Sequence, residues 1–128
     1  MEWKVYDRFG EAGLCRGERQ GLYLHIFYSG LCRGEEINRL ILVGDRDFCV
    51  LGLPVPNGKA CSLTAKFPAR QIEGMANAEG ILLPFAPGRV QRCQTDAGVE
   101  RLALLPQAAL FTRGEKQYLV WGRNFSAL

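Results

Sequence analysis

The sequence predicts an all-β protein: a small antiparallel sandwich or barrel of about nine short strands, with room for one short helix in the middle stretch. Apolar residues gather in short runs, several of which alternate with polar residues. Turn-forming residues separate these runs roughly every eight to twelve positions, which is typical of consecutive hairpins. With 128 residues, 48% of them hydrophobic and 23% charged, the chain is predicted to form one domain over residues 1–128.

The bulkiest run, Leu22–Tyr28, is expected to form the central strand. Its seven consecutive large side chains favour a strand over a helix. Alternation places Tyr23, His25 and Phe27 on one face, and on the other Leu22, Leu24, Ile26 and Tyr28. Because neither face is polar, the pattern predicts that both faces are covered by other parts of the protein.

The next hairpin is expected to turn at Arg33–Gly34. A two-residue turn there pairs Ile37–Val43 with the central strand and sets Tyr28 opposite Arg39. The same register pairs Ile26 with Ile41 and His25 with Leu42. A bulge at Gly30 would shift all of these pairs by one residue.

Arg39, Tyr28 and Arg33 are the candidate binding residues of the sequence. A guanidinium group above the Tyr28 ring would gain a cation–π contact. Its planar fork of donors could still bind a carboxylate or a phosphate. The competing interpretation is structural: Arg39 pairs with an acid such as Glu36 and closes one end of the barrel.

Two strands are expected before the central one, at Trp3–Asp7 and at Ala12–Arg16. The fragment Leu-Cys-Arg-Gly-Glu occurs at residues 14–18 and again at residues 31–35, and Arg-Gly-Glu recurs at residues 113–115. We predict that each copy turns a hairpin, because glycine adopts positive φ at low cost. The match is too short for a solenoid repeat, which needs whole repeated units.

The loop around Gly58 can be placed in two ways. A three-residue loop sets Leu53 opposite Cys61 and Leu51 opposite Leu63, apolar against apolar. A two-residue Asn-Gly turn would mix apolar with polar partners, so the first register is favoured. The strand that follows alternates cleanly and is expected to have one solvent-exposed face.

The remaining elements are a short helix at Ala69–Met75 and several further strands. Residues 88–95 show no firm period. In the last hairpin, Phe111 is expected opposite Tyr118 and Leu110 opposite Leu119, with residues 124–128 as a fraying tail. These further strands are expected at Phe48–Pro54, Ala60–Phe67, Gly80–Phe85, Val99–Leu105, Ala108–Phe111 and Tyr118–Arg123.

The composition limits where the protein is expected in the cell and which partners it is expected to bind. The N-terminal residues contain no basic segment followed by an apolar one, so we expect a cytoplasmic protein. Five cysteines without a Cys-x-x-Cys pair predict reduced, mostly buried thiols and no zinc site. The net charge of +3 is too small to imply a polyanionic partner by itself, although twelve of the sixteen basic residues are arginine. No metal and no cofactor are predicted.

No motif in the chain predicts catalysis. The single histidine, His25, lies in the middle of a strand, where a packed or sheet-face role is commoner than a catalytic one. The acids Glu35, Glu36, Asp45 and Asp47 all fall in expected turns. Neither a phosphate-binding G-x-x-x-x-G-K-[ST] loop nor a G-x-G-x-x-G turn is present.

Several short segments resemble a pattern found in small uncharacterised proteins of Clostridia. The segments that carry this resemblance are Val5–Tyr6–Asp7, Gly21–Leu22–Tyr23, Arg39–Leu40, Leu51–Gly52 and Pro56. They cover roughly the first half of the chain. Because that group has no established activity, the resemblance implies no catalytic residue, and it implies a bacterial cytosolic origin.

The expected function is therefore binding without catalysis, through contacts with another protein or with a second copy of the chain. The first alternative is a protein that binds single-stranded nucleic acid or another polyanion on strands carrying aromatic and arginine side chains. The second is a hydrolytic enzyme whose site assembles from distant residues. No association with a membrane is expected, because no apolar run approaches the roughly 20 residues of a spanning helix.

Overall fold

The computed structural model describes residues 1–34, 37–85, 87–93 and 109–121, and these ranges contain eleven strands and one short helix. The all-β class is confirmed. The strands are β1 (Glu2–Asp7), β2 (Gly10–Gln20), β3 (Tyr23–Leu31), β4 (Arg39–Val43), β5 (Phe48–Gly52), β6 (Val55–Asn57), β7 (Ala60–Pro68), β8 (Glu79–Leu83), β9 (Arg89–Cys93), β10 (Ala109–Arg113) and β11 (Lys116–Trp121), and the helix is α1 (Ala69–Ile72).

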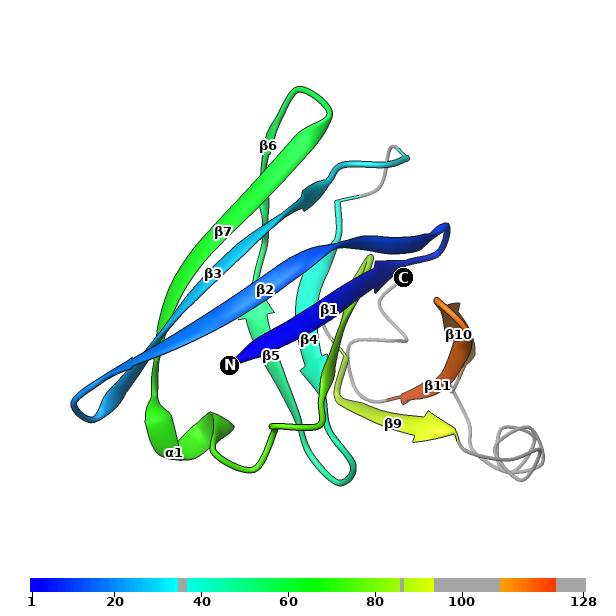
Figure 1. The fold of residues 1–128 in the computed structure, drawn as a ribbon. Helices are drawn as coiled ribbons and strands as arrows, with labels where there is room; N and C mark the ends of the chain where they lie inside the picture. Colours follow the sequence, from blue (N-terminus) through cyan, green and yellow to red (C-terminus); the bar gives the residue numbers. More distant parts are fainter. Residues whose placement is uncertain (35–36, 86, 94–108, 122–128) are drawn as a thin grey trace.

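Eight strands form one curled sheet in the order β5-β4-β8-β1-β2-β3-β7-β6. Neighbouring strands are antiparallel except β1 and β8, which run parallel over a short stretch. The two edge strands, β5 and β6, are consecutive in the chain and separated only by Leu53–Pro54. The sheet therefore curls until its two edges meet through the chain itself, and Figure 1 shows the resulting half-barrel.

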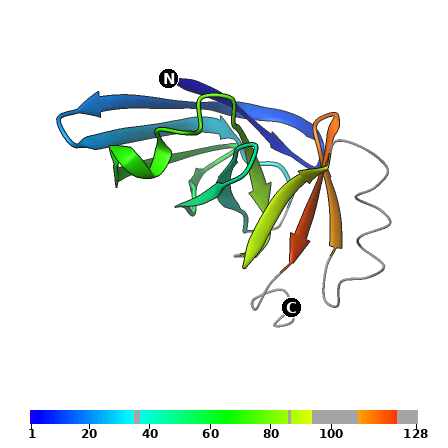
Figure 2. The same cartoon turned by 90° about the horizontal axis from the view of Figure 1, so that it is seen from below.

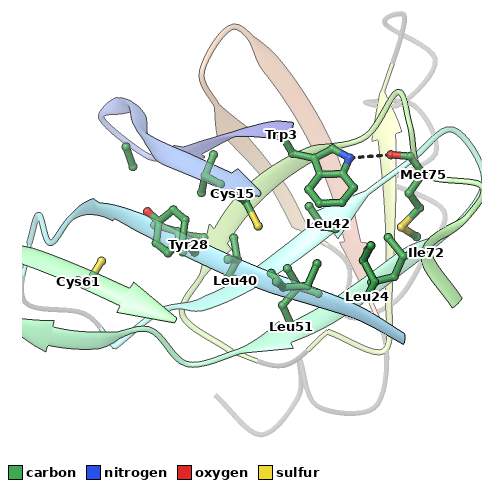
Figure 3. Packing of buried hydrophobic residues seen from close by; sticks show 14 residues of the cluster. Trp3, Cys15, Leu24, Tyr28, Leu40, Leu42, Leu51, Cys61, Ile72 and Met75 are labelled. Atoms are coloured by element: carbon green, nitrogen blue, oxygen red, sulfur yellow. Dashed lines mark hydrogen bonds between the residues drawn. The ribbon is translucent and has the colours of Figure 1, made fainter. Parts of the chain in front are cut away.

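The inside of the half-barrel holds the larger hydrophobic core. Side chains at alternate positions point inward, and Val5, Cys15, Ile26, Leu40 and Leu42 have no exposed surface. The helix α1 and the residues after it close one end of this core (Figure 3): the indole nitrogen of Trp3 donates a hydrogen bond to the carbonyl oxygen of Met75 at 2.8 Å.

The other three strands form a smaller antiparallel sheet in the order β10-β11-β9. It stands beside the half-barrel (Figure 2), against the outer side of β4 and β8. Ile41, Val43, Ile81 and Leu83 point outward from these two strands and form a second core with side chains of β9 and β11, including Val90 and Tyr118. This is why β4 and β8 are apolar on both faces.

The predicted hairpin between the central strand and residues 37–43 is wrong. Both edges of β3 are occupied, by β2 and by β7, whereas β4 lies on the opposite wall between β5 and β8. A strand that is apolar on both faces is stable only where both faces are covered. The second sheet provides that cover at β4, so the chain crosses one end of the half-barrel after β3 instead of turning back.

The predicted cover over both faces of the central strand is also wrong. Leu24, Ile26 and Tyr28 are buried, but the rings of Tyr23 and Phe27 on the other face are 44% and 43% exposed. The second sheet covers β4 and β8 and leaves the outer face of β3 open to solvent.

The register after β5 differs from both predicted alternatives. Gly58 has a positive φ of 67°, as expected, but the turn is Gly58–Lys59, which pairs β6 with β7 through Val55↔Ser62 and Asn57↔Ala60. β5 does not pair with β7, because Pro54 and Pro56 lack the amide hydrogens that a continuous ladder would need.

Only the Arg-Gly-Glu copy at residues 113–115 turns a hairpin, with Gly114 at a φ of 63°. The copy at residues 16–18 lies inside β2, which is longer than predicted. A Cβ atom at Gly17 would lie 3.1 Å from the Trp3 ring, so this glycine makes room for packing and not for a turn. In the copy at residues 31–35, Gly34 has a φ of 82° and belongs to the crossing segment after β3.

Most other elements agree with the sequence. The first strand and the solvent-exposed face of β7 are confirmed, and the pairs Phe111↔Tyr118 and Leu110↔Leu119 are confirmed residue for residue. The helix begins at Ala69 as predicted, but it ends at Ile72 and not at Met75. Residues 89–93, where no period was found, form β9. The strand expected at residues 99–105 and the tail at 124–128 lie outside the described residues. Within the described residues, no helix is long and apolar enough to span a membrane.

Candidate functional site: an exposed aromatic face

The outer side of β2, β3 and β7 forms an exposed surface that we call the aromatic face. Its centre is a row of three side chains on β3: Tyr23, His25 and Phe27. Tyr23 and Phe27 expose more than two fifths of their surface, and His25 is half-buried between its neighbours. Side chains two residues apart on a strand lie roughly 6.8 Å apart, so the row extends over more than one strand width.

Charged side chains lie on both sides of this row. On β2, Arg16 is directly opposite Phe27 and Glu18 is opposite His25. On β7, Lys66 is opposite His25, and its ammonium nitrogen lies 4.4 Å from the centre of the Tyr23 ring. Glu18 and Lys66 thus flank His25 from opposite sides, with unlike charges.

The sequence builds this face through the alternation of β3. The inward positions Leu24, Ile26 and Tyr28 belong to the main core, and this places the intervening residues outward. Leu14 on β2 adds a further apolar side chain to the same face, 37% exposed, opposite Ser29. A continuous surface with aromatic side chains at its centre and charges around them is typical of protein interfaces.

Arg33, a predicted binding residue, is committed to an ion pair at one end of the half-barrel. Its Nε and Nη2 atoms donate to the carboxylate of Asp7 at 2.8 and 2.9 Å, and Nη2 also donates to the carbonyl oxygen of Glu11 at 2.8 Å. Asp7 is 5% exposed and accepts another hydrogen bond from the amide of Phe9 at 2.7 Å. This bidentate pair ties the segment after β3 to β1.

Tyr28, the second predicted residue, is 2% exposed and belongs to the main core. Among the described residues its hydroxyl meets no nitrogen or oxygen partner, and burial, followed by the neighbouring Cys61 thiol, raises the pKa of this phenol above its ordinary value. Gly30 makes space for the hydroxyl, since a Cβ atom there would lie 2.2 Å from it. Tyr28 is therefore not a surface binding residue.

Arg39, the third predicted residue, lies far from its expected partner. It begins β4 opposite Leu83 of β8 and shares the outward face of Ile41 and Val43, whereas Tyr28 points into the half-barrel from another strand. The expected cation–π pair between Arg39 and Tyr28 is thus wrong, because the hairpin that would have joined them does not exist. The structure joins none of the three predicted residues into one site.

A second group of charged residues, which sequence reasoning missed, lies between the two sheets. Glu79 on β8 is 5% exposed and accepts hydrogen bonds from Arg92 at 2.7 and 2.6 Å, from Lys116 at 3.2 Å and from the hydroxyl of Tyr118. Arg92 also donates to Asp45 at 2.8 Å. The carboxylate is saturated by these donors, so the group holds the second sheet in place and offers no open position to a ligand.

The alternation of Tyr23, His25 and Phe27 is visible in the sequence, but such bulky side chains on both faces of a strand predict a covered face and not an exposed one. Nothing in one sequence indicates which strand receives the second sheet. The ion pair between Asp7 and Arg33 has no sequence signal, because its partners are 26 residues apart.

Comparisons with known proteins add no family: no family model, no curated protein and no solved structure matches this chain.

Proposed function

We propose that this protein is a non-enzymatic interaction domain and that its aromatic face binds a second copy of the chain. The observation that carries the proposal is the open row of Tyr23, His25 and Phe27 between side chains of opposite charge. Aromatic side chains are enriched at the centres of protein interfaces because they bury a large area at a low cost in side-chain entropy.

The charges on the two sides of the row support self-association. A two-fold axis parallel to β3 in the plane of contact would place the aromatic rows of two copies against each other. The same axis would place Glu18 of each copy over Lys66 of the other, because these residues flank His25 at the same level on opposite strands. The aromatic face is therefore complementary in charge to itself.

The mass of the protein in solution tests this proposal. Sedimentation equilibrium of the wild type at micromolar concentrations should give twice the monomer mass, and Phe27→Lys should give the monomer. Phe9→Lys is the matched control, since Phe9 is also an exposed phenylalanine, at 55%, but lies in the turn after β1. A wild type that stays monomeric, or a Phe9→Lys variant that dissociates as fully as Phe27→Lys, contradicts the proposal.

Single-stranded nucleic acid is the second candidate, because aromatic rings flanked by Arg16 and Lys66 could stack successive bases and meet the phosphates. The variant Glu18→Lys separates the two candidates. It removes the negative charge that self-association uses and adds a positive charge for a polyanion. It should weaken the dimer and, if nucleic acid is the ligand, strengthen the binding of a fluorescent oligothymidine in anisotropy measurements at low salt.

His25 stands on an open sheet face between Glu18 and Lys66, not in a cleft, so we base no hydrolytic mechanism on it. The proposed setting for this interaction is the bacterial cytoplasm, where the five thiols would stay reduced.

A further inference from the structure

A small pocket lies at the end of the half-barrel opposite α1. Its volume is about 90 Å³, close to the space that three water molecules occupy in the liquid. The apolar part of its wall comes from three separate segments of the chain: Leu31 and Ile37, Pro54 and Pro56, and Leu82. A cavity of this size and lining fits one branched aliphatic group, and it is too small for a drug-sized ligand.

We call this cavity the mouth pocket. Its rim carries apolar surface that remains open to solvent. Ile37 is 75% exposed and Leu31 is 49% exposed. Both belong to the segment that leaves β3 and crosses the end of the half-barrel. The core is closed at the other end by Ile72 and Met75, and Figure 3 shows these residues on the far side of the core from Cys61.

Arg33 lines the pocket, and two of its three guanidinium nitrogen atoms are used by other residues. Its Nε and Nη2 atoms are used by Asp7 and Glu11, whereas Nη1 has no partner within the described residues. The guanidinium charge is balanced by the Asp7 carboxylate at 2.8 Å. An anion at Nη1 would lose its hydration for a guanidinium whose charge Asp7 already balances, so the pocket favours a neutral acceptor such as a carbonyl oxygen.

The buried hydroxyl of Tyr28 marks the same end of the core. Figure 3 shows it pointing away from Leu42 and Trp3, toward the end where Cys61 lies. Burial is the main cause of the raised pKa of this phenol, and Cys61 and Asp7, which both line the pocket, add to it. A buried hydroxyl without a nitrogen or oxygen partner among the described residues is uncommon in folded proteins, and this one lies next to Cys61, a residue of the pocket wall.

We propose that the mouth pocket binds an aliphatic side chain of a peptide segment, of the size of leucine. The branched group would fill the apolar cavity, and the carbonyl oxygen of the same residue would accept a hydrogen bond from Nη1 of Arg33. This inference does not depend on the aromatic face, because the pocket is formed inside the end of the half-barrel and not on the outer side of β2, β3 and β7.

N-acetyl-L-leucinamide is a suitable probe, because it carries a neutral carbonyl group and the required side chain. Cys32 lines the pocket and is exposed, so its rate of alkylation reports whether the pocket is occupied. The probe should slow the alkylation of Cys32 by about threefold at twice its dissociation constant. N-acetyl-L-alaninamide should protect far less, and the anion N-acetyl-L-leucine should also protect less.

Two variants at side chains of similar exposure decide whether binding in the pocket causes the protection of Cys32. Ile37→Ser removes part of the wall and should abolish the protection. Leu22→Ser removes a leucine that is 78% exposed at the opposite end of β3 and should leave the protection unchanged. Equal protection by the leucine and alanine amides, no protection at any soluble concentration, or full protection in Ile37→Ser would overturn the proposal. All three outcomes leave the test of self-association unaffected.

Discussion

The hydroxyl of Tyr118 on β11 donates a hydrogen bond to the buried carboxylate of Glu79 on β8 and so joins the two sheets through one contact. Burial and this hydrogen bond together raise the pKa of Tyr118. The same carboxylate is held by Arg92 and Lys116. The second sheet is thus attached by a saturated group of charges as well as by apolar packing.

We predict that Tyr118→Phe lowers the free energy of unfolding by about 1.5–3 kcal/mol, the range for a hydrogen bond to a charged group. Urea denaturation at neutral pH measures this change. Tyr23→Phe is the control, because the Tyr23 ring is 44% exposed and its variant should stay within about 0.5 kcal/mol of the wild type. Equal losses in the two variants would show that the contact with Glu79 contributes nothing specific.

Tyr28→Phe should behave in the opposite way. Within the described part of the chain its buried hydroxyl meets only the Cys61 thiol, a weak partner, and an unsatisfied buried hydroxyl costs about 1–3 kcal/mol. Removing it should leave the free energy of unfolding unchanged or raise it, as the same urea experiment would show. A loss above about 1 kcal/mol would mean that the hydroxyl has a partner in solution.

The main core is expected to be sensitive at Ile26, which has no exposed surface. Ile26→Ala should lower the free energy of unfolding by about 2–5 kcal/mol, through lost transfer energy and the cavity left behind. Ile37→Ala makes the same chemical change at a side chain that is 75% exposed, and its effect should stay within about 0.5 kcal/mol. Similar melts for both variants would contradict the inward assignment of Ile26.

Burial raises the pKa of the Cys15 thiol to about 12 from the ordinary 9.0. Above pH 9 the unfolded chain releases this proton while the folded chain keeps it, so the thiol's contribution to stability is complete below pH 9 and falls as pH rises toward 12. The slope is about 1.4 kcal/mol per pH unit. The cost of Cys15→Ala should therefore shrink by about 1.4 kcal/mol between pH 8 and pH 10. A cost that stays constant with pH would show that the folded thiol ionises normally.

The elements of this fold follow from local patterns, but their arrangement does not. Alternation correctly placed β1, β7 and the hairpin of Phe111 and Tyr118, because each depends on neighbouring residues. The strands that pair with β3 depend on where the second sheet packs on the half-barrel, and that packing involves residues far apart in the sequence. The predicted hairpin would have brought Arg39 and Tyr28 together, but the two residues lie on strands that do not pair. The same packing explains why the bulky row on β3 is exposed, although its composition predicts a covered face.

Two of the arginines also have roles that depend on long-range packing. Arg33 and Arg92 sit in ion pairs with Asp7 and Glu79, partners separated by 26 and 13 residues. A composition rich in arginine suggested a surface for anions. In the structure, Arg33 holds the segment after β3 to β1, and Arg92 holds the second sheet to β8.

The most direct test of the aromatic face as a self-binding surface is a charge exchange across it, followed by sedimentation equilibrium. Glu18→Lys and Lys66→Glu each place like charges together at both symmetric contacts, and each should raise the dimer dissociation constant by about tenfold or more. The double variant, Glu18→Lys with Lys66→Glu, restores opposite charges and should return the dissociation constant close to that of the wild type. A wild type that stays monomeric would contradict the account. So would a double variant whose loss of dimerisation free energy equals the sum of the losses in the two single variants.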